Sequence, residues 1–573
     1  MANAPLISVK NLSIRFKTEE GYFDAVKNIS FELNKGEILG IVGESGSGKS
    51  VSSLAILGLL DKKVTQFPTG SILYNKGNEC LELLNLPEDL YRKERGNNFS
   101  IIFQEPMTSL NPVYTCGDQV AESLRLHLNM SKQEAKEKTI ALFREVELPR
   151  PEKIFDSYPH QISGGQKQRV MIAMAICCEP QLLIADEPTT ALDVTVQKEI
   201  IDLIKKLRDK NGMAVIFISH DLSLVANISD KIAVMRQGEM VEIGSAKDIF
   251  TAAKHPYTKG LIYCKPQLDT HYKKLPTVDA FFEVDENNIL IEKQPDFNSF
   301  GTLEKQIQNK EVVLEIKNLN TWYAAEKSFF GKVTSYIKAV NDVSINIYKG
   351  QTLGLVGESG CGKSTIGNTI MGIIPAFSGQ INYKGKNILN QSEKEWKQFR
   401  KTAQLIFQDP YSSLNPRKTV EQIIVEPMMV NKIGNSKQER YNKALELLET
   451  VGLQKQHLSR YPHEFSGGQR QRICIARTLA LDPEIIICDE SVSALDVSVQ
   501  AQVLNLLNEL KEKFQFTYIF ISHDLSVVKF MADQLVVMKD GIIVEQGTGE
   551  EIYKNPKEAY TKQLIQAIPV VRF

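Results

Sequence analysis

The chain has 573 residues, of which 42% are hydrophobic and 24% charged, and its formal net charge is −1. Because a domain usually contains about 100–200 residues, this length predicts at least two folded units. The near-neutral charge lacks the basic excess by which proteins bind nucleic acid, so no nucleic-acid partner is expected.

Cysteine usage and hydropathy exclude several further classes. The eight cysteines show neither the paired CxxC spacing of zinc sites nor the density of disulfide scaffolds, which fits a reducing cytosol. The segment Met1 to Phe16 lacks the basic stretch and apolar core of a signal peptide. The apolar stretches are shorter than the about 20 residues that a membrane helix needs. We therefore expect a protein that reaches a membrane only by docking to other chains.

Five sequence blocks occur twice in the same order, which indicates a gene duplication. The pairs are GESGSGKS and GESGCGKS, FQEPMTSLNP and FQDPYSSLNP, SGGQ twice, DEPTTALDVTVQ and DESVSALDVSVQ, and SHDLS twice. The segment between the two sets has little hydrophobic periodicity and many Lys, Asp, Glu, Asn and Gln residues, as linkers do. We predict domain one over 1–264, a linker over 265–311 and domain two over 312–573.

Each half contains the same succession of predicted elements. A buried strand enters a glycine loop, a second strand ends at acidic residues, an amphipathic helix follows, and a hairpin comes later. In the first half these elements are Glu37–Val42, Gln181–Ala185, Val194–Lys210 and Ile232–Ile243. In the second half they are Gln351–Val356, Glu484–Cys488, Val497–Lys513 and Leu535–Glu545, with a type I′ turn predicted at Asp540-Gly541. The pattern predicts an α/β core with strands added at its edges.

The two glycine loops match the pattern GxxxxGK[ST]. In such a loop the backbone N–H groups point at phosphates, the lysine neutralises the β- and γ-phosphates, and the hydroxyl is a Mg²⁺ ligand. The helix that follows adds its positive end to the site. Two matches, each between a strand and a helix, make ordinary turns an improbable interpretation. The candidate residues are Gly43, Glu44, Ser45, Gly46, Ser47, Gly48, Lys49 and Ser50, and Gly357, Glu358, Ser359, Gly360, Cys361, Gly362, Lys363 and Ser364.

Two carboxylates follow the second strand of each half. Asp186 and Asp489 are placed as strand-end ligands of Mg²⁺, as in other phosphate-loop enzymes. Glu187 and Glu490 come next and are placed to polarise the water that attacks the γ-phosphate. Alone, such a pair is more often a solvated strand end, but the preceding glycine loop favours the catalytic interpretation.

The ordered series of glycine loop, SGGQ, acidic strand, ALD and SHD resembles the ATP-binding subunits of ABC transporters. The resemblance covers nearly all of both halves and implies two tandem P-loop NTPase domains of the α/β class. Each domain would have a RecA-like core, an antiparallel β subdomain and a helical subdomain. It also implies that the SGGQ motif of each half covers the nucleotide held by the glycine loop of the other, within one chain. These signature residues are Ser163, Gly164, Gly165 and Gln166, and Ser466, Gly467, Gly468 and Gln469.

The same resemblance implies roles for further residues. Gln104 and Gln408 would sense the metal and the attacking water, and His220 and His523 would be switch histidines near the γ-phosphate. Phe16 and Tyr323 match the aromatic residue that stacks on adenine, although an aromatic at a strand end is often a core residue. Because both halves keep the signature, the carboxylates and the histidine, both sites are expected to hydrolyse ATP.

Further blocks are similar to one subfamily. The chain is similar to the ATPases of dipeptide, oligopeptide, nickel and glutathione importers in three blocks. These are FQ[ED]PxxSLNP, ALDV[TS]VQ, and HPYTKGLI at His255–Ile262 with its weaker repeat at Glu558–Ile565. This implies two membrane-spanning permease partners, an extracytoplasmic solute-binding protein, and a peripheral location at the cytoplasmic face of the inner membrane. The resemblance does not identify the transported solute. The rival hypothesis is a soluble tandem ABC protein that acts on ribosomes. A third hypothesis, a DNA-repair ATPase, would need zinc-type cysteine pairs or a long coiled coil, and the sequence shows neither.

Two cysteines bear on this resemblance. Some relatives hold an iron–sulfur cluster with cysteines after the HPYT block, but Cys264 stands alone there, so no cluster is expected. Cys361 lies in the second glycine loop, and the favoured interpretation is a small residue tolerated where the first loop has Ser47. The alternative is that the helix N-terminus favours a thiolate there and makes the site sensitive to thiol reagents.

Overall fold

A six-stranded sheet forms the centre of each half in the computed structural model, which describes residues 4–19, 21–77, 79–104, 109–190, 192–266, 272–285, 290–301, 311–327 and 333–569. In the first half the strand order is β10-β9-β3-β8-β7-β6, and only the β9–β10 pair is antiparallel. The central strands are buried on both faces, which explains their unbroken apolar sequences. The strands are β3 (Ile38–Val42), β6 (Phe99–Ile102), β7 (Leu182–Asp186), β8 (Ala214–Ser219), β9 (Lys231–Arg236) and β10 (Glu239–Ser245).

The second half repeats this sheet in the order β18-β19-β20-β15-β21-β22. Its β21–β22 hairpin turns at Asp540 and Gly541, which have φ angles of 48° and 82°. Two positive φ angles are what a type I′ turn requires, so the predicted turn is confirmed. The strands are β15 (Thr352–Val356), β18 (Ala403–Ile406), β19 (Ile485–Asp489), β20 (Thr517–Ile521), β21 (Gln534–Lys539) and β22 (Ile542–Thr548).

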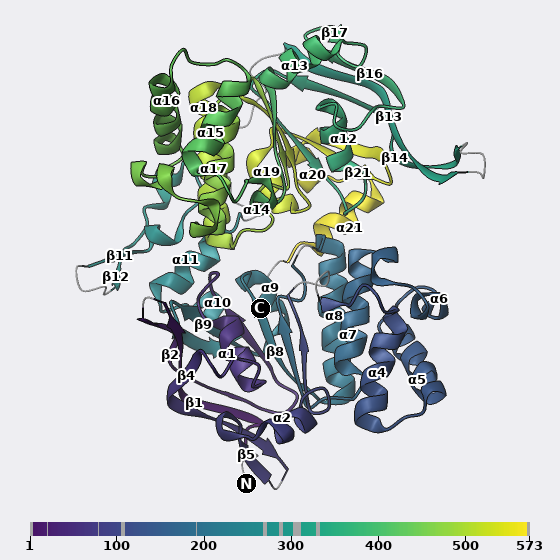
Figure 1. Ribbon diagram of the computed structural model, residues 1–573, viewed down its shortest axis with the longest axis vertical. Coiled ribbons are helices and arrows are strands. Elements are labelled where there is room, and N and C mark those ends of the chain that lie inside the picture. Colours follow the sequence, from purple (N-terminus) through teal and green to yellow (C-terminus); the bar gives the residue numbers. More distant parts are fainter. Residues whose placement is uncertain are drawn as a thin grey trace.

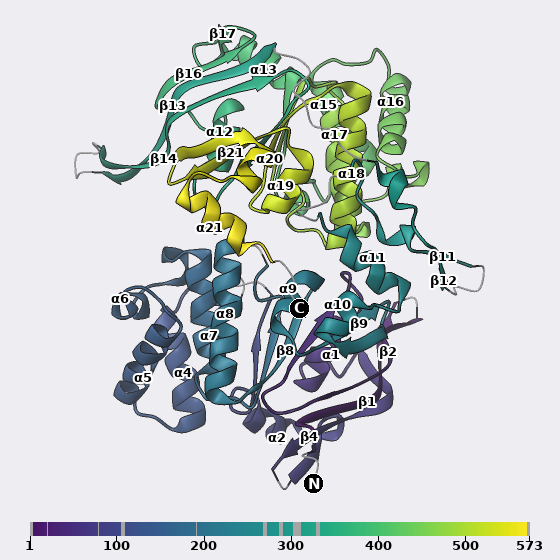
Figure 2. The ribbon, with the colours of Figure 1, turned by 180° about the vertical axis from the view of Figure 1, so that it is seen from behind.

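A separate antiparallel sheet lies beside each central sheet, in the orders β2-β1-β4-β5 and β14-β13-β16-β17. The long β13–β14 pair projects from the second half as an arm in Figures 1 and 2. The first-half strands are β1 (Ile7–Thr18), β2 (Gly21–Leu33), β4 (Thr65–Lys76) and β5 (Glu79–Glu82). The second-half strands are β13 (Val312–Lys327), β14 (Val333–Tyr348), β16 (Ser378–Tyr383) and β17 (Lys386–Asn387).

Helices cover the central sheets and form a helical part in each half. The first-half helices are α1 (Lys49–Ile56), α2 (Glu88–Glu94), α4 (Cys116–Leu128), α5 (Lys132–Glu145), α6 (Pro151–Phe155), α7 (Gly164–Ile176), α8 (Val194–Asn211), α9 (Leu222–Ile228), α10 (Ala246–Thr251) and α11 (Pro256–Cys264). The second-half helices are α12 (Lys363–Ile370), α13 (Glu393–Thr402), α14 (Pro410–Ser413), α15 (Val420–Val430), α16 (Lys437–Thr450), α17 (Gly467–Leu479), α18 (Val497–Phe514), α19 (Leu525–Met531), α20 (Gly549–Lys554) and α21 (Ala559–Ala567). The predicted α/β architecture with tandem halves is confirmed.

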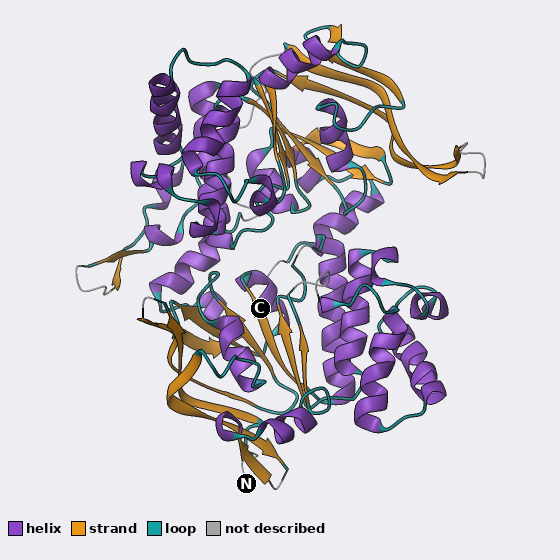
Figure 3. Cartoon of the chain, in the orientation of Figure 1, coloured by secondary structure: helices purple, strands orange, loops and turns teal. Residues whose placement is uncertain are grey.

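The two halves are arranged head to tail. In Figure 3 the helical part of the lower half lies on the right and that of the upper half on the left, so each faces the sheet side of the other. Helix α11 of the first half contacts α18 of the second, and α21 of the second half contacts α8 of the first. A continuous cluster of buried apolar side chains includes residues of both halves.

Part of the predicted linker is folded. Within the described residues of 265–311, β11 (Phe282–Val284) pairs with β12 (Leu290–Glu292), and Phe281 and Phe282 are buried. The backbone N–H of Leu275 donates to Asn505 Oδ1 at 2.8 Å, and Asn505 Nδ2 donates to the Leu275 carbonyl at 2.9 Å. This segment therefore contacts α18 of the second half as well as the first half. The domain boundaries themselves stay a prediction.

Candidate active sites

Each glycine loop curls tightly around the end of a central strand. Gly43 has φ 156°, and a Cβ atom there would lie 2.2 Å from the Met235 carbonyl oxygen; at Gly357 it would lie 2.2 Å from the Met538 carbonyl oxygen. Only glycine fits such close backbone approaches. The loops lead directly into α1 and α12, whose N-terminal ends carry positive partial charge.

The loop lysines are buried and held by backbone oxygens. Lys49 Nζ donates to the Gly43 carbonyl at 2.7 Å and to the Glu44 carbonyl at 2.8 Å. Lys363 makes the same two bonds to Gly357 and Glu358, at 2.7 and 2.8 Å. Carbonyl oxygens carry no net charge, so the positive charge of each lysine stays available for a phosphate. Burial lowers the pKa of Lys49, although the carboxylates of Glu187 and Asp186 oppose that effect.

Two of the residues expected at the magnesium ion in each half are in contact. Ser50 Oγ donates to Asp186 Oδ1 at 3.0 Å, and Ser364 Oγ donates to Asp489 Oδ1 at 2.7 Å. Burial raises the pKa of both aspartates. A hydroxyl and a carboxylate side by side next to a phosphate loop are the oxygen donors that Mg²⁺ prefers, so the donor set fits this metal.

The glutamate that follows each aspartate is held by the expected glutamine and histidine. In the first half, Glu187 Oε2 accepts from Gln104 Nε2 at 3.2 Å and lies 3.2 Å from His220 Nδ1. Thr190 Oγ1 also donates to this oxygen, at 2.9 Å. Burial alone would raise the pKa of Glu187, but the hydrogen bond and the charge of His220 outweigh it and lower the pKa to about 2.

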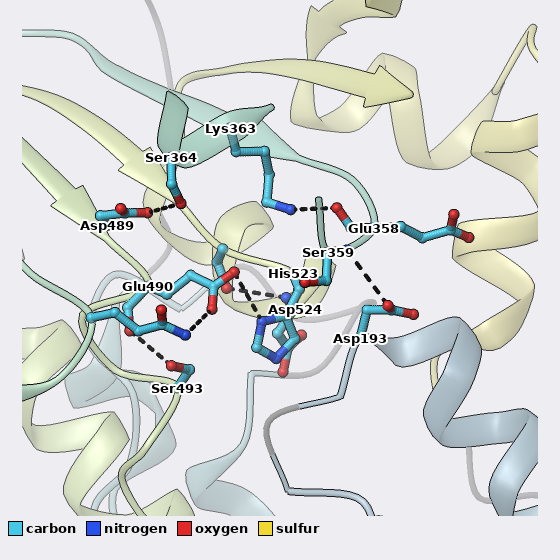
Figure 4. Close-up of polar contacts among 12 residues, drawn as sticks. Asp193, Glu358, Ser359, Lys363, Ser364, Asp489, Glu490, Ser493, His523 and Asp524 are labelled. Carbon is cyan, nitrogen blue, oxygen red and sulfur yellow. Dashed lines mark hydrogen bonds and ion pairs between the residues drawn. The ribbon is translucent and has the colours of Figure 1, made fainter. Parts of the chain in front are cut away.

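The second half repeats the contacts with the glutamine and the histidine, but Ser493, at the position of Thr190, donates to the Glu490 backbone carbonyl at 2.9 Å (Figure 4). Glu490 Oε2 accepts from Gln408 Nε2 at 2.7 Å, and Glu490 Oε1 lies 3.5 Å from His523 Nδ1. Burial alone would lower the pKa of His523, yet the hydrogen bond with Glu490 raises it, and the same holds for His220 with Glu187. Each glutamate is thus an ionised acceptor beside a histidine that readily takes a proton.

Both glutamates also have an unusual backbone. The φ angles are 47° at Glu187 and 45° at Glu490, in the left-handed region that residues with a side chain seldom adopt. Such strain persists only where surrounding structure enforces it, and it is concentrated at functional sites. The backbone N–H of Glu187 donates to the Ile218 carbonyl at 3.0 Å and that of Glu490 to the Ile521 carbonyl at 3.0 Å, which anchors each residue to the neighbouring strand.

The signature motifs begin helices α7 and α17. Ser163 accepts a hydrogen bond from the Gln166 N–H, and Gln166 accepts one from the Ser163 N–H, which makes a capping box. Ser466 and Gln469 form the same capping box at α17. In the part of the chain that the structure describes, neither motif has a hydrogen bond or ion pair with the glycine loop of the other half. Their expected pairing with those loops stays a prediction.

Other residues do connect the loops across the two halves. The Ser359 N–H donates to Asp193 Oδ2 at 3.5 Å, so the second glycine loop meets the ALD block of the first half (Figure 4). The Ser498 hydroxyl, just after the second ALD block, donates to the Glu44 carboxylate. The sequence contains both ALDV[TS]VQ blocks, but it did not predict that they contact the glycine loops.

The HPYT block also reaches the glycine loop. Tyr257 Oη accepts a hydrogen bond from the Glu44 N–H at 3.1 Å, and Tyr560 Oη accepts one from the Glu358 N–H at 3.1 Å. Tyr257 is completely buried and Tyr560 nearly so. The sequence showed the paired YTK motifs but no signal that their tyrosines meet the loops.

The proposed adenine-stacking residues lie on the antiparallel sheets. Phe16 is half-buried in β1 opposite Phe23, and Tyr323 is exposed in β13 opposite Ile337. Their stacking role stays a prediction.

Cys361 is placed as the favoured interpretation, a tolerated small residue, would have it. Its thiol is buried, and burial raises its pKa more than the neighbouring Lys363 lowers it. This burial favours the interpretation as a tolerated small residue over that of a reactive thiolate. Cys264 is also buried, which raises the pKa of its thiol; residues 267–271 of the following segment lie outside the described residues, and the expectation of no cluster stays a prediction.

Comparison with known proteins agrees with this geometry. The ABC transporter family model matches residues 26–190 and 340–493, which contain both glycine loops and both acidic strands. The chain belongs to the ABC transporter family. It is an ATP-binding subunit whose ATPase activity is coupled to transport. A second family model, the oligopeptide/dipeptide transporter C-terminal region, matches residues 241–280 and 544–573.

Curated relatives of this ABC protein are similar over nearly the full chain. The glutathione import ATP-binding protein GsiA of Pectobacterium atrosepticum is 44% identical over 566 residues, which cover 99% of this chain and 90% of the relative. The protein of the same name from Salmonella paratyphi A is 45% identical over 567 residues, with the same coverage. A solved dimeric bacterial ABC transporter cassette aligns at 28% identity over 41% of this chain and 98% of its own, with a TM-score of 0.37. Neither the family models nor these relatives support the ribosome hypothesis. Among the described helices, none is long and apolar enough to cross a membrane.

Proposed function

We propose that this chain drives an importer for glutathione or for small peptides of similar size. The observation that carries this proposal is the 44–45% identity with glutathione import ATP-binding proteins across 99% of the chain. Both halves also contain the C-terminal region of oligopeptide and dipeptide transporters. Glutathione is itself a tripeptide, so the two comparisons favour related solutes.

The same relationship supports a proposal for the assembly. The chain would lie at the cytoplasmic face of the membrane, against two membrane-spanning permeases that receive the solute from an extracytoplasmic binding protein. The fused halves would supply the pair of ATP-binding domains within one polypeptide. Their head-to-tail contacts support this arrangement, since Ser359 meets Asp193 and Glu44 meets Ser498.

The residues of each half suggest how ATP is hydrolysed. The loop N–H groups and Lys49 or Lys363 would bind the phosphates. Ser50 with Asp186, and Ser364 with Asp489, would hold Mg²⁺, which neutralises phosphate charge when it is bound.

The glutamates would then orient and polarise the attacking water. Glu187 and Glu490 are ionised acceptors, so each can accept a hydrogen bond from water and aim its oxygen at the γ-phosphorus. His220 and His523 contact these carboxylates and would stabilise the charge that develops on the γ-phosphoryl oxygens. The signature serines of the opposite half would complete each site when the halves close.

Two experiments test this proposal. The tagged chain is purified from its own cells in mild detergent, and membrane and ribosome fractions are compared. Two multi-spanning membrane chains should accompany it, and glutathione with the binding protein should stimulate ATP hydrolysis in the reconstituted complex. Recovery with ribosomes alone would contradict the proposal that the chain belongs to an importer. Stimulation of ATP hydrolysis by nickel but not by glutathione would contradict the proposal that glutathione is the solute.

Variants test whether both sites work. Glu187→Gln and Glu490→Gln should each reduce ATP turnover, because each removes one water-orienting carboxylate. The full rate in either variant would contradict hydrolysis at both sites.

A further inference from the structure

A small cavity of about 90 Å³ lies where the halves meet, between residues 219–221 and 522–524, which carry the switch histidines and which we call the switch loops. Its lining is nearly the same from both sides. The first half contributes His220 and Asp221, and the second half contributes His523 and Asp524, the equivalent residues of the second SHD block. Equivalent residues of the two halves therefore meet at this cavity, which we call the central cavity.

One position breaks this symmetry. Tyr257 and Tyr560 are equivalent because each accepts a hydrogen bond from its own glycine loop, and they are 303 residues apart. The same spacing pairs Lys265 with Ile568, and both line the central cavity. The cavity thus contains two equivalent carboxylates but one lysine, contributed by the first half.

Lys265 makes an ion pair with one of these carboxylates. Its Nζ lies 2.5 Å from Asp221 Oδ2, and the two side chains are only 15% and 16% exposed. The other oxygen of Asp221 caps helix α9, accepting from the N–H groups of Ser223 and Leu224 at 2.9 and 3.2 Å. Lys265 therefore ties the end of α11 to the residue that directly follows the switch histidine His220.

The second switch loop has the same cap without the lysine. Asp524 Oδ1 accepts from the N–H groups of Ser526 and Val527 at 2.8 and 3.4 Å. Among the residues that the structure describes, Asp524 has no ion pair, and Ile568 occupies the position equivalent to Lys265. The loop that carries His523 thus lacks the tether that holds the loop of His220.

Lys265 is attracted by an aspartate of each switch loop. Burial would lower the pKa of its ammonium, but the attraction of Asp221, and then that of Asp524, raises it. The lysine stays charged, and it attracts the carboxylate from each half while bonding to the first.

We propose that Lys265 is a positioning residue that makes the two ATP sites unequal. It restrains the loop of His220 and leaves that of His523 freer, so site one, with Glu187 and His220, performs the larger share of hydrolysis. This inference rests on the proposed function, because it assumes that both sites hydrolyse ATP. Because a single ion pair has a small net free energy, we expect a bias of about twofold to fivefold between the sites.

The bias can be measured within one molecule. The full chain, in complex with its permeases, is incubated with Mg²⁺, vanadate and 8-azido-ATP, then irradiated, and peptide mass spectrometry gives the ratio of trapped nucleotide in the two halves. Trapping requires a competent site, so this ratio reports how often each site reaches the transition state. A general loss of folding lowers both signals and leaves the ratio unchanged.

Three variants test the role of the lysine. Lys265→Ile gives both halves the same residue and should bring the ratio to one. Lys265→Arg keeps the charge and should preserve the bias. The exchange Lys265→Ile with Ile568→Lys moves the cation to Asp524, so the bias should reverse in favour of site two.

The outcomes separate this inference from the proposed function. Equal trapping in the natural protein, an unchanged bias in Lys265→Ile, or no reversal in the exchange variant would each overturn the role of Lys265 while leaving two-site hydrolysis intact. Trapping in neither half of the natural protein would instead overturn the proposed hydrolysis, and the inference with it.

Discussion

Removing one hydroxyl should loosen one glycine loop and leave the other unchanged. In Tyr257→Phe the Glu44 N–H loses its acceptor, which the structure places 3.1 Å away on a fully buried side chain. A buried donor left without a partner costs about 1–3 kcal/mol. Glu44 is only half-buried, so water can partly replace the lost bond, and we expect about 1–2 kcal/mol.

Hydrogen exchange measures this effect at the residue concerned. A cost of about 1–2 kcal/mol corresponds to roughly 5–30-fold faster exchange of the Glu44 amide, followed by mass spectrometry with fragmentation. The Glu358 amide of the same molecule serves as the internal control, because its bond to Tyr560 is intact. Tyr560→Phe should give the opposite pattern.

The same variant should weaken ATP binding at site one. The loop N–H groups must point together at the phosphates, so a looser loop raises the dissociation constant by up to the same factor. Tyr263→Phe, on the same helix but exposed, controls for loss of a hydroxyl from α11. Unchanged exchange at Glu44 in Tyr257→Phe would refute the argument that the HPYT tyrosine supports the loop.

Two further predictions concern titration and thiol reactivity. In Glu187→Gln the pKa of His220 should fall, because the charge and hydrogen bond that raise it are lost, and histidine NMR should show no change at His523. In the natural protein this contact stabilises the fold fully between about pH 4.5 and 6.5. It loses its contribution as the pH rises through the raised folded-state pKa of His220, or falls through the pKa of about 2 of Glu187. Glu187→Gln should abolish that dependence. A maleimide should modify the exposed Cys80 well before the buried Cys361, as followed by mass spectrometry of labelled peptides. Inactivation that disappears in Cys361→Ser would show that the buried thiol is reactive after all.

The phosphate loops and acidic strands were predictable because their chemistry is local. A loop such as Gly43–Ser50 needs glycines, a lysine and a hydroxyl at fixed spacing, and Asp186 must end a buried strand, so the pattern is visible without the fold. The place of His220 near the γ-phosphate was expected only through the resemblance, and its contact with Glu187 was not predicted. Spacing alone does not show that residues on different strand ends share one site.

Two sequence-based arguments were incomplete because burial is a tertiary property. The helix N-terminus next to Cys361 suggested a lowered pKa, but packing around the thiol raises it. The segment 265–311 has the composition of a linker, yet Phe281 and Phe282 are buried and Leu275 bonds to Asn505 in the other half. Composition indicated exposure there, whereas contacts from distant residues removed these side chains from water.

The duplicated motifs alone imply two ATP sites of equal chemistry, because each half repeats the same residues at the same spacing. Only the folded chain brings Asp221 and Asp524 to one cavity and places Lys265 between them. The physical reason is that charge pairing depends on distance in space, and the residues that meet at this cavity are separated by about 300 positions in the chain.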